Sequence, residues 1–94
     1  MAKYRKKPVE VEAFKFYVDA MPDWFMDLMS TNKAVTHNCD HRRWGIDEAY
    51  CIIDIPSREK ICVFGGEYIV KDENGEVSTC KPDIFHATYE QVGD

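Results

Sequence analysis

Three side chains that can bind a metal stand at alternate positions near the middle of this 94-residue sequence: His37, Cys39 and His41. Positions i, i+2 and i+4 of an extended strand lie on one face, and imidazole nitrogen and thiolate sulfur are ligands of tetrahedral zinc. The sequence offers three cysteines as a fourth ligand: Cys51, Cys62 and Cys80. Most zinc sites instead pair their ligands about two to four residues apart, with a second pair farther on. A metal site and a polar hairpin loop are therefore both open interpretations of the triplet.

Cys80 and His86 are the other candidates for chemistry. A nucleophilic cysteine must be present as the thiolate, and Lys81 or His86 could favour that form after folding. The alternative is that Cys80, at the end of a strand, is a small buried apolar residue. The sequence has no serine-centred nucleophile elbow and no phosphate-binding glycine loop. We therefore expect that the protein is not an enzyme and that it needs no cofactor.

The segment from His37 to Tyr50 interrupts the alternation of the strands on either side and gathers residue types that dominate binding energies in interfaces. The candidate binding residues are Arg42, Arg43, Trp44 and Tyr50. Tryptophan and tyrosine offer large rigid surfaces, and arginine donates several hydrogen bonds. The alternative is that Trp44 folds back and caps the sheet.

A net charge of −5 disfavours the broad cationic surface that binds nucleic-acid phosphates. A basic stretch is present within residues 1–7, which we expect to form a flexible arm; its cations are Lys3, Arg5, Lys6 and Lys7. No apolar run approaches the roughly 20 residues that cross a bilayer, and no secretion signal follows the basic start. We expect a cytoplasmic protein whose cysteines are free thiols.

The length is that of one modest domain, which we expect to comprise residues 1–94. The segment "PVEVEAFKFY" begins with Val9, Val11 and Ala13 alternating with glutamates, the pattern of a strand with one buried face. Phe14 and Phe16 occupy the opposite parity. Either a bulge near Ala13 redirects the chain, or the end of this strand is covered on both faces.

A helical period follows, from Pro22 to about Ser30. The apolar residues Trp24, Phe25, Leu28 and Met29 form one stripe of an α-helix. We expect Pro22 at the first helical position. A helix of about nine residues is not stable alone in water, so we expect the stripe to pack on a sheet; contact with a partner or cofactor is the alternative.

Alternating segments dominate the rest of the chain: "AVTH", "AYCIIDI", "EKICVF", "EYIVK" and "EVSTC". Their short connections predict antiparallel pairing. Asn74-Gly75 suits a type I′ hairpin turn, although a two-residue loop would place Glu73 opposite Glu76, and a bulge at Gly75 would separate these like charges. We predict an α+β fold, in which a small, curled, mostly antiparallel sheet of five or six strands packs on one short α-helix.

The last part of the sequence contains further turn signals. Gly65-Gly66 gives the backbone freedom between two strands. Pro82-Asp83 suits a helical turn from Pro82 to His86, after which "TYEQV" is expected to be extended. These residues have structural reasons to be present, and none of them requires a substrate.

The two ends of the chain carry several short motifs, at residues 4–9, Gly66, Tyr68, Gly75, Glu76, 80–85 and 88–90. With them the chain resembles a family of short bacteriophage and prophage proteins, which begin with a "KYRKKPV"-type arm and end in a Gly-Asp-Tyr turn, a Gly-Glu hairpin and "CKPDIF…TYE". Two positions depart from the family pattern, because Gly65 stands where proline is usual and Glu67 replaces the aspartate of the turn. The resemblance implies a phage origin and a shared fold, and no activity.

For function, we expect a phage-encoded accessory protein that binds, without catalysis, a host protein such as a defence or metabolic enzyme. The alternative is a protein that binds or sequesters a small ligand such as a nucleotide. A homo-oligomer is compatible with both. We expect no membrane or nucleic-acid partner, and a location in the cytoplasm of the bacterial host.

Overall fold

The structure of this protein is a computed structural model that describes residues 2–3, 10–54 and 59–90. The expected interior of the basic arm, at residues 4–7, lies outside the described residues, as does Val9. The elements within the described residues are β1 (Glu12–Lys15), α1 (Asp23–Ser30), β2 (Ala34–His37), β3 (Tyr50–Ile53), β4 (Ile61–Phe64), β5 (Tyr68–Lys71), β6 (Val77–Cys80) and α2 (Pro82–Thr88).

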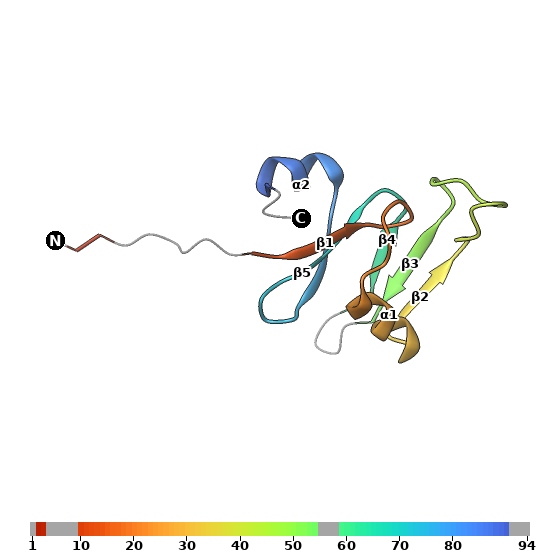
Figure 1. Ribbon diagram of the computed structural model, residues 1–94, viewed down its shortest axis with the longest axis horizontal. Helices are drawn as coiled ribbons and strands as arrows, with labels where there is room; N and C mark the ends of the chain where they lie inside the picture. The colour runs from red at the N-terminus through yellow and green to blue at the C-terminus, as the bar shows by residue number, and fades with distance from the viewer. Residues whose placement is uncertain (1, 4–9, 55–58, 91–94) are drawn as a thin grey trace.

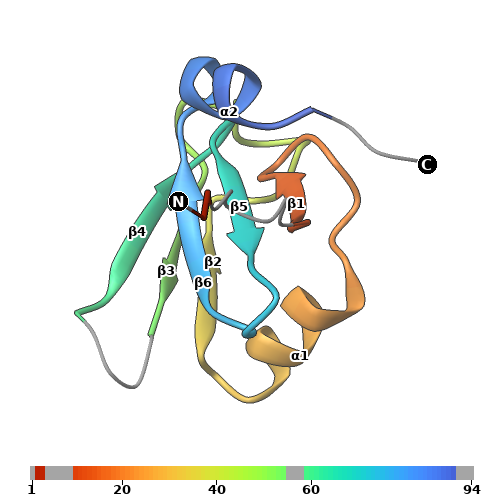
Figure 2. The ribbon, with the colours of Figure 1, turned by 90° about the vertical axis from the view of Figure 1, so that its left-hand side faces the viewer.

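The strands form two antiparallel three-stranded sheets, in the orders β1-β5-β6 and β2-β3-β4 (Figure 1). The predicted α+β class, with antiparallel strands and one short helix against them, is confirmed. The strands form two sheets rather than one, because β4 pairs with β3 whereas β5 pairs with β1 and β6. The two helices lie toward opposite ends of the strands, with α1 at the bottom and α2 at the top of Figure 2.

Hydrogen bonds at the turn between β4 and β5 join the two halves of the fold. The N–H of Phe16 donates to the carbonyl of Glu67, and the N–H of Gly66 donates to the carbonyl of Phe16, both at 2.9 Å. The N–H of Gly65 donates to the carbonyl of Ala49 at 2.9 Å. The segment that follows β1 and the segment that precedes β3 are therefore both fixed at this turn.

The expected phase of the first strand is wrong at Ala13. Ala13 is exposed, whereas Phe14 and Phe16 are buried. The phenylalanines control the phase because each buries more apolar surface than valine or alanine. The centroids of the Phe14 and Phe25 rings lie 5.0 Å apart.

Helix α1 places its apolar stripe on the core, as predicted. Phe25 is fully buried, and Trp24, Leu28 and Met29 pack against the core cluster. Trp24 meets the edge of Phe14 at a centroid distance of 5.7 Å. The boundary differs by one residue, because Pro22 is the N-cap, with extended backbone, and the helix begins at Asp23.

The hairpin between β5 and β6 contains the bulge that the sequence allowed. Only Gly75 has a positive φ, of 81°, whereas a type I′ turn would require one at Asn74 as well. The carboxylate of Asp72 accepts the N–H groups of Asn74 and Glu76, both at 2.9 Å. The N–H of Asp72 donates to the carbonyl of Glu76, so Glu73 does not stand opposite Glu76.

The second helix is longer than predicted, since it begins at Pro82 but continues to Thr88. The helix contacts the first sheet through aromatic stacking: the ring of Phe85 stacks on that of Tyr68 of β5, with a distance of 3.9 Å between the ring centroids. The extended path resumes only at Tyr89. Neither helix of the described chain has the length and apolar character needed to cross a membrane.

Candidate functional site

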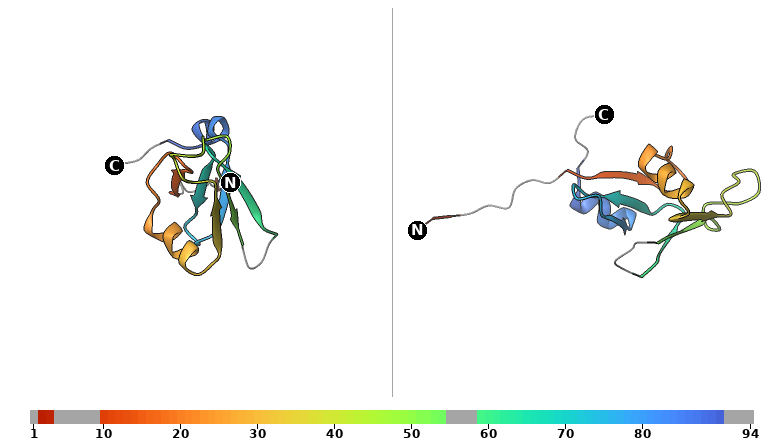
Figure 3. Two further views of the ribbon diagram at one scale, coloured as in Figure 1. Left: turned by 90° about the vertical axis from the view of Figure 1, so that its right-hand side faces the viewer. Right: turned by 90° about the horizontal axis from the view of Figure 1, so that it is seen from below.

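The loop that joins β2 to β3, residues 38–49, is hereafter called the β2–β3 loop. In the right-hand view of Figure 3 it lies at one end of the molecule, on the far side from α2. The loop has no regular secondary structure, but its own hydrogen bonds hold it in shape. Asp40 organises the first turn, because its carbonyl accepts the N–H groups of Arg43 and Trp44, both at 2.9 Å. Its carboxylate accepts the N–H of Arg42 at 3.0 Å.

The second turn of the loop is closed in the same way. The N–H of Gly45 donates to a carboxylate oxygen of Glu48 at 2.5 Å, and the N–H of Glu48 returns to the carbonyl of Gly45 at 3.1 Å. The side-chain amide of Asn38, a residue with a φ of 58°, donates to the carbonyl of Glu48 at 3.1 Å. The two ends of the loop are thereby joined to each other.

Tyr17 attaches the loop to the core. Its ring stacks on His41 with a centroid distance of 4.0 Å and an interplanar angle of 11°, and its hydroxyl donates to the carbonyl of Trp44. Partial burial, followed by the nearby Cys39, Asp40 and Glu48, raises the pKa of the Tyr17 hydroxyl, which favours the protonated form that donates. Tyr17 was not among the residues predicted from the sequence, because nothing in the residue type signals its φ of 72°.

Gly65 provides the second attachment. A Cβ at this position would lie 2.3 Å from the carbonyl oxygen of Ile46, so only glycine allows the loop to approach this closely. A residue without an N–H, such as proline, could not make the hydrogen bond that Gly65 donates to the carbonyl of Ala49.

Within this fixed backbone, the predicted residues Arg42, Arg43 and Trp44 remain exposed to solvent. The Arg42 side chain is 91% exposed and forms an ion pair with Asp40 at 3.4 Å, a contact that contributes little at the surface. Arg43 forms no ion pair with any described residue. The carbonyl of Trp44 is anchored by Tyr17, and the residue is 37% exposed, so about a third of it is open to solvent and the rest is covered.

The fourth predicted binding residue, Tyr50, does not join this group. It is the first residue of β3 and stacks on His37 of the paired strand, at a centroid distance of 4.7 Å. The predicted set therefore divides into a loop group and a residue on the sheet.

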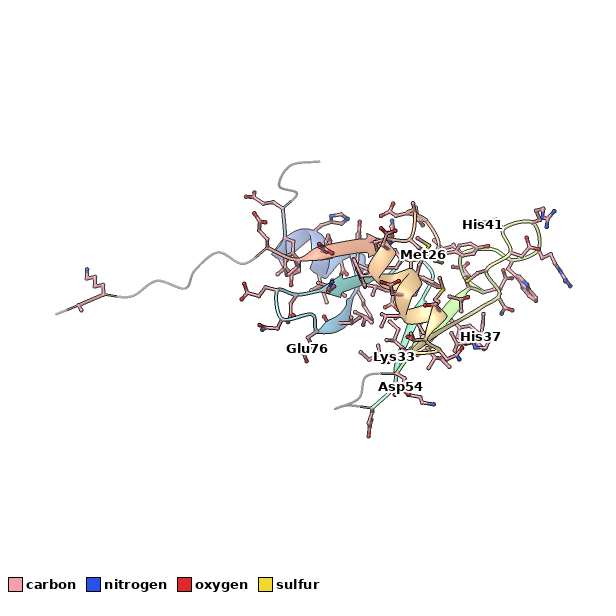
Figure 4. All side chains as sticks on the ribbon, turned by 60° about the horizontal axis from the view of Figure 1, so that its bottom comes forward. Met26, Lys33, His37, His41, Asp54 and Glu76 are labelled. Atoms are coloured by element: carbon pink, nitrogen blue, oxygen red, sulfur yellow. The ribbon has the colours of Figure 1, made fainter. Side chains whose placement is uncertain are left out.

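The metal triplet is not held on one strand face, as the spacing required. Strand β2 ends at His37, and the positive φ of Asn38 turns the chain away. His37 stacks on Tyr50, His41 stacks on Tyr17, and the two histidines lie well apart in Figure 4. Cys39 donates its thiol to the carbonyl of His37 at 3.3 Å. Among the residues that the structure describes, no three metal-binding side chains come together.

The cysteines Cys39, Cys51, Cys62 and Cys80 are all free thiols. Burial, with smaller contributions from Cys39 and Cys62, raises the pKa of Cys51 to about 12. Burial also raises the pKa of Cys39. Both shifts favour the unreactive thiol over the thiolate.

The suggested pair of Cys80 and His86 is not brought together by any contact. The partners of His86 are the hydroxyl of Tyr68, at 3.5 Å from its Nε2, and the ring of Phe85. Among the described residues, no hydrogen bond or ion pair joins a basic side chain to Cys80.

The described residues form a small pocket and a larger, open groove. The smaller has a volume of about 200 Å³ and lies among α1, the end of β3 and the β5–β6 hairpin, with Lys33, Asp54 and Glu76 at its rim (Figure 4). The larger, of about 710 Å³, is an open groove whose lining is mostly acidic: Glu10, Val11, Glu12, Lys71, Asp72 and Glu73. Carboxylates at these densities repel nucleotide phosphates, so the larger groove does not suit the nucleotide alternative.

No protein-family model, curated protein or solved structure matches this chain. The β2–β3 loop must therefore be interpreted from its own geometry.

Proposed function

We propose that this protein is a non-catalytic binding module that acts on a protein of a bacterial host, in the host cytoplasm, and that the β2–β3 loop is its contact surface. The observation that carries the proposal is the combination of a fixed backbone and accessible side chains: Tyr17 and Gly65 hold the loop, while Arg43 is exposed and Trp44 is partly exposed. Folding alone does not need an exposed tryptophan and arginine at the tip of a well-anchored loop.

Two physical arguments support this interpretation. Tryptophan, tyrosine and arginine are the residues most enriched among those that dominate binding energies. A loop already held in its bound shape loses less conformational entropy on binding than a mobile one. The internal bonds of Asp40 and Glu48 therefore serve recognition as well as folding. The resemblance to phage proteins is the basis for proposing a host partner.

The experiment is affinity capture from bacterial lysate with the wild type and with the double variant Arg43→Ala/Trp44→Ala. We expect the double variant to unfold within a few degrees of the wild type and to lose the captured protein. The control is Ile84→Ala, an exposed apolar residue on α2, away from the loop. Retention of the captured protein by the double variant would refute the proposed surface.

A thermal-shift screen with nucleotides distinguishes the small-ligand alternative. A ligand present at a hundred times its dissociation constant should stabilise the fold by about 2.7 kcal/mol. Stabilisation by a nucleotide, with no protein captured, would replace the protein-binding proposal by the alternative.

A further inference from the structure

The second sheet has an uncovered face that is distinct from the β2–β3 loop. Its core face carries Ala34, Cys51, Ile53 and Val63, all buried. The opposite face, called here the open face, carries the residues between them: Val35, His37, Tyr50, Ile52, Cys62 and Phe64. Phe64 is 55% and Val35 46% exposed, and the face contains no Asp, Glu, Lys or Arg.

The strand register arranges the open face in two parallel rows. Val35, Ile52 and Cys62 are direct cross-strand partners and form a row of aliphatic and small side chains. His37, Tyr50 and Phe64 form the next row, which consists entirely of rings. The side chains of the aliphatic row therefore project less far from the sheet than those of the ring row.

Such a face is complementary to itself. Consider two copies packed face to face, with a two-fold axis in the plane between the sheets and perpendicular to the strands. This axis places the ring row of each copy over the aliphatic row of the other. Large side chains then meet small ones, which is the arrangement that fills space between packed layers, and the strands remain aligned as in β-sandwiches. A two-fold contact of this kind uses the same patch on both copies.

The size of the face is that of the apolar centre of a small dimer interface. Val35, Cys62 and Phe64 are exposed, whereas His37, Tyr50 and Ile52 are only partly exposed, which leaves on the order of 300 Å² of apolar surface here. A standard interface buries about 800 Å² on each partner, somewhat more than half of it apolar. A polar rim at one end of the strands is available from side chains of both charges: Lys33, Asp54 and Lys60. The N–H of Asp54 donates to the carbonyl of Lys33 at 2.7 Å.

We infer that the open face is the interface of a homodimer, formed by packing the β2-β3-β4 sheets of two copies against each other. The two-fold axis places the β2–β3 loops at opposite ends of the dimer, where both remain exposed. A dimer would thus present two loops, which raises the avidity for a partner with two sites.

The test is sedimentation equilibrium of the full chain over a range of micromolar concentrations, with circular dichroism to monitor the fold. We expect the wild type to reach the mass of two chains, and Phe64→Asp to raise the dimer dissociation constant more than tenfold. Val35→Asp, on a different strand, should have the same effect and keeps the test decisive if Phe64→Asp fails to fold. The control is Ile84→Asp, which is as exposed as Phe64, at 55%, but lies on α2.

Several results would overturn the inference. They are a wild type with the mass of one chain at every concentration, folded Phe64→Asp and Val35→Asp variants that still dimerise, and a dimer that Ile84→Asp dissociates equally well. Because neither variant touches the β2–β3 loop, loss of the dimer and loss of partner capture are separate outcomes.

Discussion

At the scale of single residues, Tyr17 and Gly65 attach the β2–β3 loop to the rest of the fold. Tyr17 stacks on His41 and bonds the carbonyl of Trp44 from a left-handed backbone conformation. Gly65 allows the carbonyl of Ile46 to approach where any side chain would collide. These two residues determine where the exposed arginines and tryptophan lie, although neither was a candidate from its type.

Substitution of Gly65 by alanine should show this close approach directly. The added Cβ would lie 2.3 Å from a backbone oxygen, which cannot rotate away, so we expect a loss of about 1–3 kcal/mol in the free energy of unfolding. The control is Gly45→Ala in the same loop, whose Cβ would meet only the movable carboxylate of Glu48 at 3.1 Å. Urea unfolding measures both, and equal losses would show that the contact at Gly65 is not restrictive.

Cys51 should make the protein sensitive to alkaline pH. Its pKa of about 12 in the fold exceeds the ordinary value of 9.0, so the unfolded chain releases the thiol proton first. The stabilisation is complete below pH 9 and is lost as the pH rises toward 12. Urea unfolding at increasing pH should show a steeper loss for the wild type than for Cys51→Ala, and parallel profiles would contradict the assignment.

At the scale of elements, the sequence was most informative where one period ran through a whole segment. The apolar stripe of α1 predicted both the helix and its buried side, because Phe25 and its apolar neighbours leave water only by packing on the core. The hairpin at Gly75 was also predictable, since repulsion between Glu73 and Glu76 disfavours the two-residue loop and favours a bulge. Elements defined by local pattern were therefore predictable.

Features that depend on distant parts of the chain were not predictable. The pairing of β1 with β5, and hence the division into two sheets, is set by contacts far apart in sequence. The phase of β1 is decided by Phe14 packing on Phe25. For the site, Arg42, Arg43 and Trp44 were recognised from residue type, but the separation of Tyr50 from them depends on its register with His37.

Removal of the Trp24 side chain tests the docking of α1. The ring is partly buried against Phe14 and Phe25 and lies 5.7 Å below the Nζ of Lys71. Trp24→Ala should cost about 2–4 kcal/mol of unfolding free energy, somewhat less than a fully buried ring would. Met26→Ala, on the exposed side of the same helix, should cost under about 0.5 kcal/mol. Similar losses for the two variants would mean that the helix does not face the core as described.

At the scale of the whole molecule, the two proposed contact surfaces lie on different parts of the described structure. One end carries the β2–β3 loop, one side of the second sheet carries the open face, and the opposite half carries α2 (Figure 1). The central claim is that the β2–β3 loop is an ordered binding surface and not a mobile connection between two strands.

Hydrogen exchange of the loop amides tests this claim most directly. The N–H groups of Trp44, Gly45 and Glu48 have acceptors within the loop, so we expect them to exchange far more slowly than in an unfolded peptide. Tyr17→Phe removes only the hydroxyl that bonds the carbonyl of Trp44, so it should accelerate exchange in the loop while leaving the amides of β3 and β4 protected. Exchange of the loop amides at unfolded rates in the wild type would contradict the account.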